Sequence, residues 1–153
     1  MNSFFGGFAN LDGSITIDAG PDEDTVKGSL FGETIYGGGE NDIIEGGSGN
    51  DFLWGHEGID TIDGGFGNDF IVGGEPEEND DDILRGGPGV DEIYGGGGGD
   101  FINGGWGSDK LYGGPGFDTI HGDTDDAFAS GYGAGDDLIY ASLKESVGEF
   151  WFW

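Results

Sequence analysis

Aspartate recurs at fixed spacing through most of this chain, together with glycine and one aliphatic residue. The stretches GGSGNDFLW, GHEGIDTID and GGFGNDFIV follow one another without a gap from residue 46 to residue 72. Aspartate carboxylates and backbone carbonyls supply hard oxygen ligands, which Ca²⁺ takes at about 2.3–2.6 Å, whereas Mg²⁺ demands tighter octahedral geometry and keeps more of its water. The spacing therefore indicates a repeated site for a hard divalent cation.

The repeats share the nine-residue frame G-G-x-G-x-D-x-U-x, in which U is a large aliphatic residue; its positions are numbered first to ninth below. Twelve units fit this frame between Ala19 and Tyr140. Two units are longer than the rest: one carries an insertion at residues 75–79, and the last covers residues 122–140. Several units match every fixed position, so chance is a poor explanation even in a glycine-rich chain.

Composition narrows the possible partners. The chain has 153 residues, which favours one domain. It carries a net charge of −28, with four lysines and arginines and no cysteine, so no disulfide offsets the cost of ordering its 38 glycines. The acidic excess repels nucleic acid and anionic membranes and attracts multivalent cations. The first residues show neither the basic segment nor the apolar run of a signal peptide, and we expect no transmembrane segment.

The units from Ala19 to Tyr140 resemble the calcium-binding nonapeptide repeats of the RTX family. The resemblance implies an all-β fold, a right-handed parallel β-roll (β-solenoid) of about six two-unit coils. In that family the first part of each unit forms a turn and the end of the unit a short strand. We therefore expect an N-terminal aromatic cap at 1–18, the roll at 19–140, and a C-terminal cap or type I secretion signal at 141–153.

The eighth position should form the core of this roll, because side chains alternate along a strand and the middle one of a short strand points inward. A core one residue wide is too thin to offset the entropy of ordering the chain. We therefore expect the chain to fold only with Ca²⁺ bound. The twelve predicted core residues are Val26, Ile35, Ile44, Leu53, Ile62, Ile71, Leu84, Ile93, Ile102, Leu111, Ile120 and Ile139.

Successive turns of such a roll fall on opposite edges, so metal ligands should pair between units two apart. One edge is predicted to carry Asp24, Asp42, Asp60, Asp82, Asp100 and Asp118, and the other Asp51, Asp69, Asp91, Asp109 and Asp137. Neighbouring pairs give roughly nine calcium sites. The turn glycines are expected to contribute carbonyl oxygens: Gly47, Gly49, Gly65, Gly67, Gly87, Gly89, Gly96, Gly98, Gly105, Gly107, Gly114 and Gly116.

Three places depart from the frame and put particular sites in doubt. Glu33 stands where aspartate is expected, and we expect the site between it and Asp51 to be empty. The insertion at residues 75–79 is expected to loosen the site of Asp60 and Asp82. The extended last unit is expected to do the same for Asp109 and Asp137.

One sheet should present an aromatic column at the ninth position. The column consists of Tyr36, Trp54, Val72, Tyr94, Tyr112 and Tyr140. A contiguous exposed patch of this kind often marks an interface, although aromatic residues also stack along strands without any partner. The aromatic stretches near both ends of the chain are expected either to cap the roll or to join one roll to the next.

Catalysis is not expected. His56 and His121 lack the spacing of a zinc site, and the chain has no G-x-S-x-G motif. We expect an extracellular, type I-secreted calcium-binding protein with a structural role, a homo-oligomer or filament joined through its aromatic face or ends. The alternative is a secretion and folding module of a larger exported hydrolase or toxin. Carbohydrate binding by the aromatic column stays open, whereas Thr25, Thr34 and the other threonines are too scattered for ice.

Overall fold

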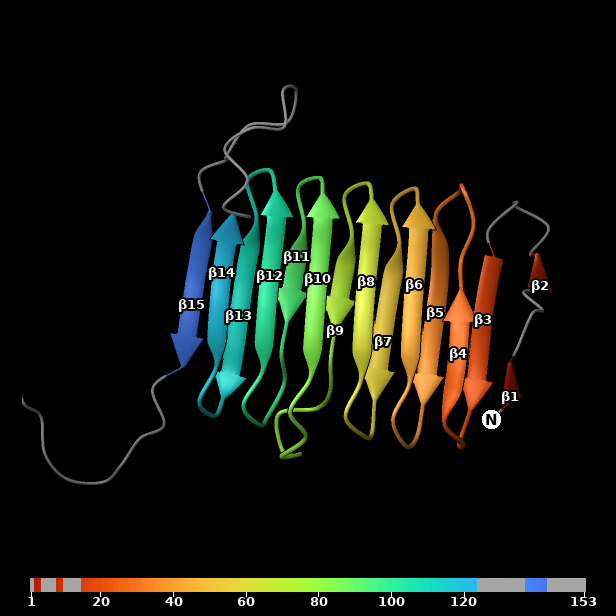
Figure 1. The fold of residues 1–153 in the computed structure, drawn as a ribbon, viewed down its shortest axis with the longest axis horizontal. Helices are drawn as coiled ribbons and strands as arrows, with labels where there is room; N and C mark the ends of the chain where they lie inside the picture. Colours follow the sequence, from red (N-terminus) through yellow and green to blue (C-terminus); the bar gives the residue numbers. More distant parts are fainter. Residues whose placement is uncertain (1, 4–7, 10–14, 124–136, 143–153) are drawn as a thin grey trace, which may run out of the picture.

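The computed structural model describes residues 2–3, 8–9, 15–123 and 137–142. This part of the chain is all-β and contains no helix. Its strands build two sheets that face each other as a parallel β-solenoid of about six coils, seen in Figure 1 as two layers whose strands run in opposite directions. The predicted fold class is confirmed.

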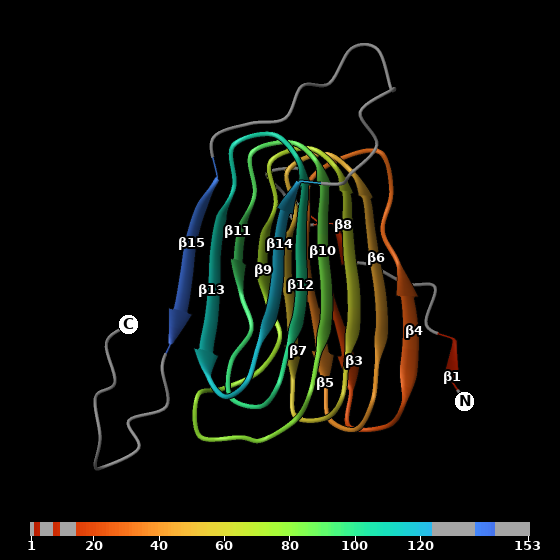
Figure 2. The ribbon, with the colours of Figure 1, turned by 60° about the vertical axis from the view of Figure 1, so that its left-hand side comes forward.

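From β3 onward, successive strands alternate between the two sheets, so that the sheet neighbours are strands two apart in the chain (Figures 1 and 2). Only β2 and β3 pair antiparallel among the described strands. The first sheet contains β1 (Asn2–Ser3), β4 (Asp24–Lys27), β6 (Ile43–Ser48), β8 (Thr61–Phe66), β10 (Ile83–Pro88), β12 (Phe101–Trp106) and β14 (Thr119–Asp123). The second contains β2 (Phe8–Ala9), β3 (Ile15–Gly20), β5 (Glu33–Gly38), β7 (Phe52–His56), β9 (Phe70–Val72), β11 (Glu92–Tyr94), β13 (Lys110–Pro115) and β15 (Leu138–Ser142).

The strand register places the same repeat position side by side in neighbouring coils. Ile44 pairs with Ile62, and Gly47 pairs with Gly65. Several strands run on through the first positions of the next unit, so β6, β8, β10, β12 and β13 are six residues long. These strands are longer than the resemblance implied, because the first glycines of a unit continue the ladder of the strand before them.

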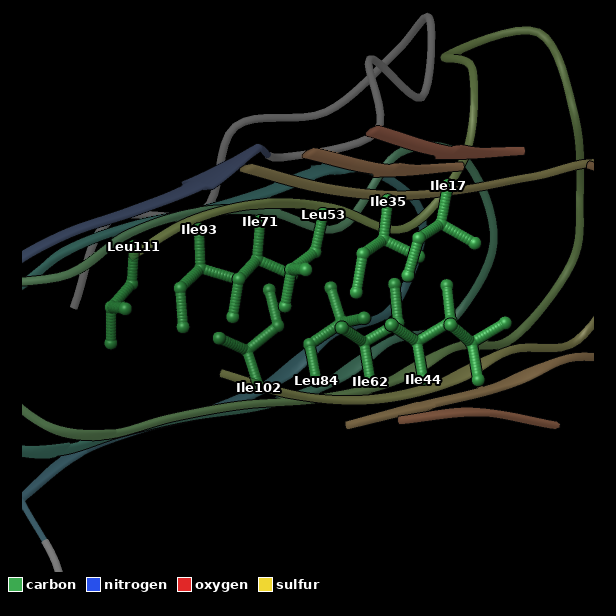
Figure 3. Packing of buried hydrophobic residues seen from close by; sticks show 11 residues of the cluster. Ile17, Ile35, Ile44, Leu53, Ile62, Ile71, Leu84, Ile93, Ile102 and Leu111 are labelled. Carbon is green, nitrogen blue, oxygen red and sulfur yellow. The ribbon is translucent and has the colours of Figure 1, made fainter. Parts of the chain in front are cut away.

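The core is the predicted column of eighth-position residues, with one addition. Figure 3 shows the two rows of aliphatic side chains pointing toward each other from opposite sheets. Residues from Val26 to Leu111 in the column are fully buried. Ile17 joins them at 5 % exposure, although its segment lies before the first unit that the frame recognises. Ile120 is partly buried and Ile139 is 45 % exposed, so the core thins toward the C-terminal end.

The expected caps fall mostly outside the described residues. Of the N-terminal segment, β1 pairs with β4, β2 pairs with β3, and β3 is itself a strand of the roll paired with β5. The roll therefore includes residues from Ile15 onward. The C-terminal segment after residue 142, with the sequence GEFWFW at its end, lies outside the described part of the chain. None of the described residues forms a helix long and apolar enough to cross a membrane.

Candidate metal centre

The sixth-position carboxylates form two continuous hydrogen-bond ladders, one along each edge of the roll. In each step, one carboxylate oxygen accepts a hydrogen bond from the backbone N–H of the sixth residue two units earlier, at 2.7–3.1 Å. This arrangement holds each side chain in the turn between two coils. The structure therefore brings together the pairs expected from the sequence: Asp24, Asp42, Asp60, Asp82, Asp100 and Asp118 on one edge, and Glu33, Asp51, Asp69, Asp91, Asp109 and Asp137 on the other.

The other carboxylate oxygen has no hydrogen-bond partner in most of these residues. This oxygen is buried and unpaired in Asp42, Asp51, Asp60, Asp69, Asp91 and Asp100, and one oxygen of Asp24 is likewise buried without a hydrogen-bond partner. These side chains are at most 5 % exposed. Burying an unpaired carboxylate oxygen is costly, and native structures rarely tolerate one without a ligand, an ion or a bound water. A regular row of them indicates a row of cation sites.

The first glycine of each unit makes room for these oxygens. A Cβ on Gly46 would stand 2.6 Å from Asp51 Oδ2 and 2.6 Å from the carbonyl oxygen of Gly64. A Cβ on Gly64 would likewise stand 2.5 Å from Asp69 Oδ2 and 2.8 Å from the carbonyl oxygen of Gly86. The missing side chain thus leaves a space where an unpaired carboxylate oxygen and a backbone carbonyl meet. A carboxylate oxygen and the carbonyl oxygen of a first-position glycine also meet at Gly37, Gly55, Gly73, Gly86, Gly95 and Gly104.

The glycines named from the sequence occupy the second and fourth positions, and the structure places them differently from the first. The carbonyl oxygen of a second or fourth glycine lies against the backbone of the equivalent residue two units later. Gly47 faces Gly65, and Gly49 faces Gly67. The carbonyl beside each unpaired carboxylate belongs instead to a first-position glycine, which sequence reasoning did not include. Most of the named glycines have positive φ, which explains their residue type: Gly47, Gly49, Gly65, Gly67, Gly87, Gly96, Gly98, Gly105, Gly107 and Gly114.

Burial raises the pKa of the central carboxylates in both ladders. The pKa rises to about 6 for Asp42, Asp51, Asp69 and Asp100. It rises to about 7 for Asp60 and to about 8 for Asp82 and Asp91. Loss of water around the carboxylate is the largest cause, neighbouring carboxylates add to it, and the backbone hydrogen bond opposes it. Without a cation, burial shifts these carboxyl groups toward their neutral form, most of all Asp82 and Asp91.

The irregular units keep the ladder intact. Asp60 N–H donates to Asp82 Oδ1 at 2.8 Å across the insertion, and Asp109 N–H donates to Asp137 Oδ1 at 3.0 Å across the extended last unit. Glu33 differs from the aspartates. Its carboxylate accepts hydrogen bonds from Ser29 N–H at 3.0 Å and from the Ser29 hydroxyl.

A further ladder at the fifth position was not anticipated from the sequence. The Oδ1 atom of Asn41, Asn50 or Asn68 accepts a hydrogen bond from the backbone N–H of the fifth residue in the next coil, at 2.9 Å. Asp81 plays the same role for Gly99 N–H at 2.7 Å. The signal in the sequence is the pair Asn-Asp at the fifth and sixth positions. These side chains fix the turns that carry the carboxylates.

Side chains alone do not complete a metal site. Within the described residues, no group of three or more Asp, Glu, His or Cys side chains is placed to hold a metal ion. Any cation between the coils must therefore take backbone oxygens as well, as the paired carboxylate and glycine carbonyl allow. The two histidines lie away from the ladders: the ring of His56 stacks on Tyr36, and that of His121 contacts Phe101.

Comparison with known families agrees with this geometry. A family profile described as the RTX calcium-binding nonapeptide repeat matches the chain four times, over residues 27–62, 46–75, 78–111 and 103–126. The chain belongs to this RTX family. Neither the curated proteins nor the solved structures contain a match to the chain. The RTX repeats bind calcium, so this is a calcium-binding β-roll protein, and its unpaired carboxylates and glycine carbonyls fit that ion.

The second sheet of the RTX roll carries the predicted aromatic column. Rings stack between neighbouring strands at Tyr36 and Trp54, with centroids 5.4 Å apart, and at Tyr94 and Tyr112, with centroids 4.5 Å apart. Tyr112 and Tyr140 continue the column at 4.7 Å, while Phe70 links Trp54 to Tyr94. A groove of about 340 Å³ runs beside the column, bordered by Trp54, Phe70, Tyr94, Tyr112 and Pro76.

Proposed function

We propose that this RTX roll is a secreted protein that folds when it binds calcium outside the cell and then acts as a structural, self-associating element. The row of buried, unpaired carboxylate oxygens is the observation that carries the proposal. In a chain of net charge −28, ordering these carboxylates without a counter-ion works against folding. Calcium binding to the folded state alone supplies the missing stability. The role follows from ion binding, and no catalytic step is proposed.

The proposed calcium sites number roughly nine, one for each neighbouring pair of aspartates in a repeat of this kind. The pair of Glu33 and Asp51 is left out. Both oxygens of Glu33 accept hydrogen bonds from Ser29, so this carboxylate lacks the unpaired oxygen found in aspartates such as Asp51 and Asp69. The retained ladder bonds support including the irregular pairs, Asp60 with Asp82 and Asp109 with Asp137.

The location of folding follows from calcium concentration. Extracellular calcium modules bind with Kd of about 10⁻⁴–10⁻³ M, far above the free calcium of cytosol. The chain would therefore remain unfolded where it is made and could thread through an export channel. It would fold on reaching millimolar calcium. Membership of the RTX family supports type I secretion as the route.

We also propose that the aromatic column mediates self-association. Its rings lie in line over several strands, and the exposed Phe52 and Tyr140 extend the apolar surface at 49 % and 47 % exposure. A carbohydrate partner is less well supported. Sugars stack on the faces of aromatic rings, but Tyr94, Tyr112 and Tyr140 are nearly parallel and cover each other's faces. Their edges, with the groove beside Pro76, are better suited to another apolar surface.

Light scattering coupled to size exclusion tests this function. The full chain should elute as a compact species larger than a monomer in millimolar calcium, and as an extended monomer in chelator. Substituting Tyr94 and Tyr112 by serine should leave calcium-dependent folding in place and yield monomers. A wild-type chain that is a folded monomer at every concentration would instead favour a secretion and folding module of a larger hydrolase or toxin.

A further inference from the structure

A groove opens beside the aromatic column at one edge of the second sheet. Val72 and Tyr94 border it as the last residues of β9 and β11, and Pro115 borders it as the last residue of β13. These strands run parallel, and in Figure 1 their arrowheads point to the same edge of the roll. Pro76, from the insertion between β9 and β10, borders the groove as well. The groove therefore lies where the strands of the second sheet end.

The groove is apolar in a strongly acidic chain. Its volume of about 340 Å³ lies near the lower end of the range for pockets that hold small ligands, about 300–1,000 Å³, so it has room for a few side chains. Trp54 and Phe70 are half-buried at the groove, and Pro76 and Pro115 are exposed. Among the described residues that line it, Glu75 alone carries a charge. The groove suits uncharged, apolar side chains.

The last described strand brings the chain to this groove. Ser142, the final residue of β15, pairs in register with Pro115, which borders the groove. Figure 2 shows β15 beside β13, with the ends of both strands at the same edge. Residues 143–153 follow Ser142 and include the uncharged aromatic run FWFW at 150–153. The most aromatic stretch of the chain is thus tethered next to an apolar groove.

The tether is long enough for this run to cross the groove. From β15 to β9 there are three strand spacings, which together amount to roughly 15 Å. Residues 143–149 can span up to about 23 Å when extended, which leaves some length for the chain to turn back. A short tether also gives a segment an effective concentration of about the millimolar range at its own groove. The segment of the same chain is therefore favoured over a free partner at low protein concentration.

We propose that the aromatic run at 150–153 docks into this groove of its own folded roll and competes there with a second copy of the chain. The rings of Trp54, Tyr94 and Tyr112 border the groove and belong to the column proposed to mediate self-association. A docked segment covers them, so a second copy must displace it. The segment thereby limits self-association. This competition rests on the proposed function, whereas the docking needs only a folded roll.

Tryptophan fluorescence follows the segment directly. The chain has four tryptophans, and two of them, Trp151 and Trp153, lie in the aromatic run. Trp54→Phe together with Trp106→Phe leaves these two as the only tryptophans and keeps an aromatic ring at the border of the groove. Acrylamide should quench their fluorescence several-fold less in millimolar calcium than in chelator. This protection should not change on dilution, because the docking occurs within one chain.

Two substitutions in the aromatic column provide a matched comparison in the same background. Tyr112→Ser removes a ring that borders the groove, whereas Tyr36→Ser removes a ring of the same column that does not border it. The protection should be lost in Tyr112→Ser and kept in Tyr36→Ser. Circular dichroism at saturating calcium checks that each variant folds. If Tyr112→Ser does not fold, Pro76→Ser opens the groove at an exposed residue of the insertion instead.

Self-association of the otherwise wild-type chain tests the competition. Trp151→Ser together with Trp153→Ser should lower the protein concentration at which copies associate, by about tenfold if the segment occupies its groove about nine-tenths of the time. Light scattering in millimolar calcium measures this concentration. Unchanged or weaker association of this variant would refute the competition.

The results that overturn the docking differ from those that overturn the proposed function. If the roll folds with calcium but acrylamide quenches the two tryptophans as strongly as in chelator, or equally in Tyr112→Ser and Tyr36→Ser, the segment does not dock in the groove and the proposed function stands. Protection that disappears on dilution would also refute the docking, because the segment would then occupy the groove of a second copy. If the wild type does not fold with calcium, the proposed function fails and takes this inference with it.

Discussion

Adding one methyl group to a first-position glycine should selectively disable a calcium site. A Cβ on Gly55 would stand 2.6 Å from the carbonyl oxygen of Gly73, closer than real Cβ contacts come, and would also collide with Asp60 Oδ2. On the same edge, a Cβ on Gly39 would have no atom nearer than the Cα of Pro21 at 3.6 Å. Gly55→Ala and Gly39→Ala therefore make the same chemical change, one inside an ion site and one outside it.

The size of the effect follows from two contributions. Overpacking against backbone costs about 1–3 kcal/mol. Loss of one ion at millimolar calcium removes about 1–3 kcal/mol more, given the affinities of extracellular calcium modules. Gly55→Ala should therefore lower the free energy of unfolding by about 2–6 kcal/mol. Gly39→Ala should change it by less than about 1 kcal/mol, in the stabilising direction, because alanine restricts the unfolded chain.

Urea unfolding at fixed millimolar calcium measures both variants, and a calcium titration counts the ions bound. Gly55→Ala should bind fewer ions than the wild type, while Gly39→Ala should bind the same number. If the two variants unfold at the same urea concentration and bind equal amounts of calcium, then the space beside Gly55 holds no ion and the assignment of the first-position glycines is refuted.

Three further predictions follow from the same geometry. Asp69→Asn, with Asp22→Asn at an exposed position as control, should weaken calcium-dependent folding, because it removes a buried carboxylate beside the ion sites and keeps an oxygen for the hydrogen bond from Asp51 N–H. Circular dichroism during a calcium titration should show a higher folding midpoint for Asp69→Asn than for the control, and equal midpoints would contradict this. Burial raises the pKa values of Asp42, Asp60 and Asp82 to about 6, 7 and 8 in the calcium-free roll, above the ordinary value of about 4 in an unfolded chain. The calcium-free roll therefore loses stability as the pH rises from about 4 through 8, and circular dichroism in chelator should show more sheet at pH 4–5 than at pH 8; more sheet at the higher pH would contradict this. Glu40 adopts a φ of 66°, where a residue with a Cβ is strained and glycine is not. Glu40→Gly should therefore raise the free energy of unfolding by about 0.5–1 kcal/mol. Glu57 is not one of the residues with positive φ, so Glu57→Gly should lower the free energy of unfolding.

The sequence predicted those features of the fold that repeat. The aliphatic eighth position and the aspartate sixth position are periodic, so the core column and the division of carboxylates between the two edges follow from counting residues. Ile17 was not predicted because residues 10–18 lack the first two glycines and the sixth-position aspartate of the frame, although the Ile17 side chain is buried with the others.

Features that depend on local conformation could not be read from the pattern. Which glycine carbonyl lies beside a carboxylate is decided by the direction of the peptide unit, and the sequence shows only that glycine is present. The path of the insertion, and hence the position of Glu78, is set by hydrogen bonds to Glu75 and Gly97 that no repeat specifies. Glu40 and His56 likewise adopt positive φ, at 66° and 74°, where other units use glycine.

The central claim is that calcium ions between the coils supply the stability that the narrow core lacks. Far-ultraviolet circular dichroism of the full chain, recorded in millimolar calcium and again after complete chelation, tests it most directly. We predict a sheet spectrum with calcium, and the spectrum of an unfolded chain without it, restored when calcium is returned. An unchanged sheet spectrum after chelation at neutral pH would contradict the account.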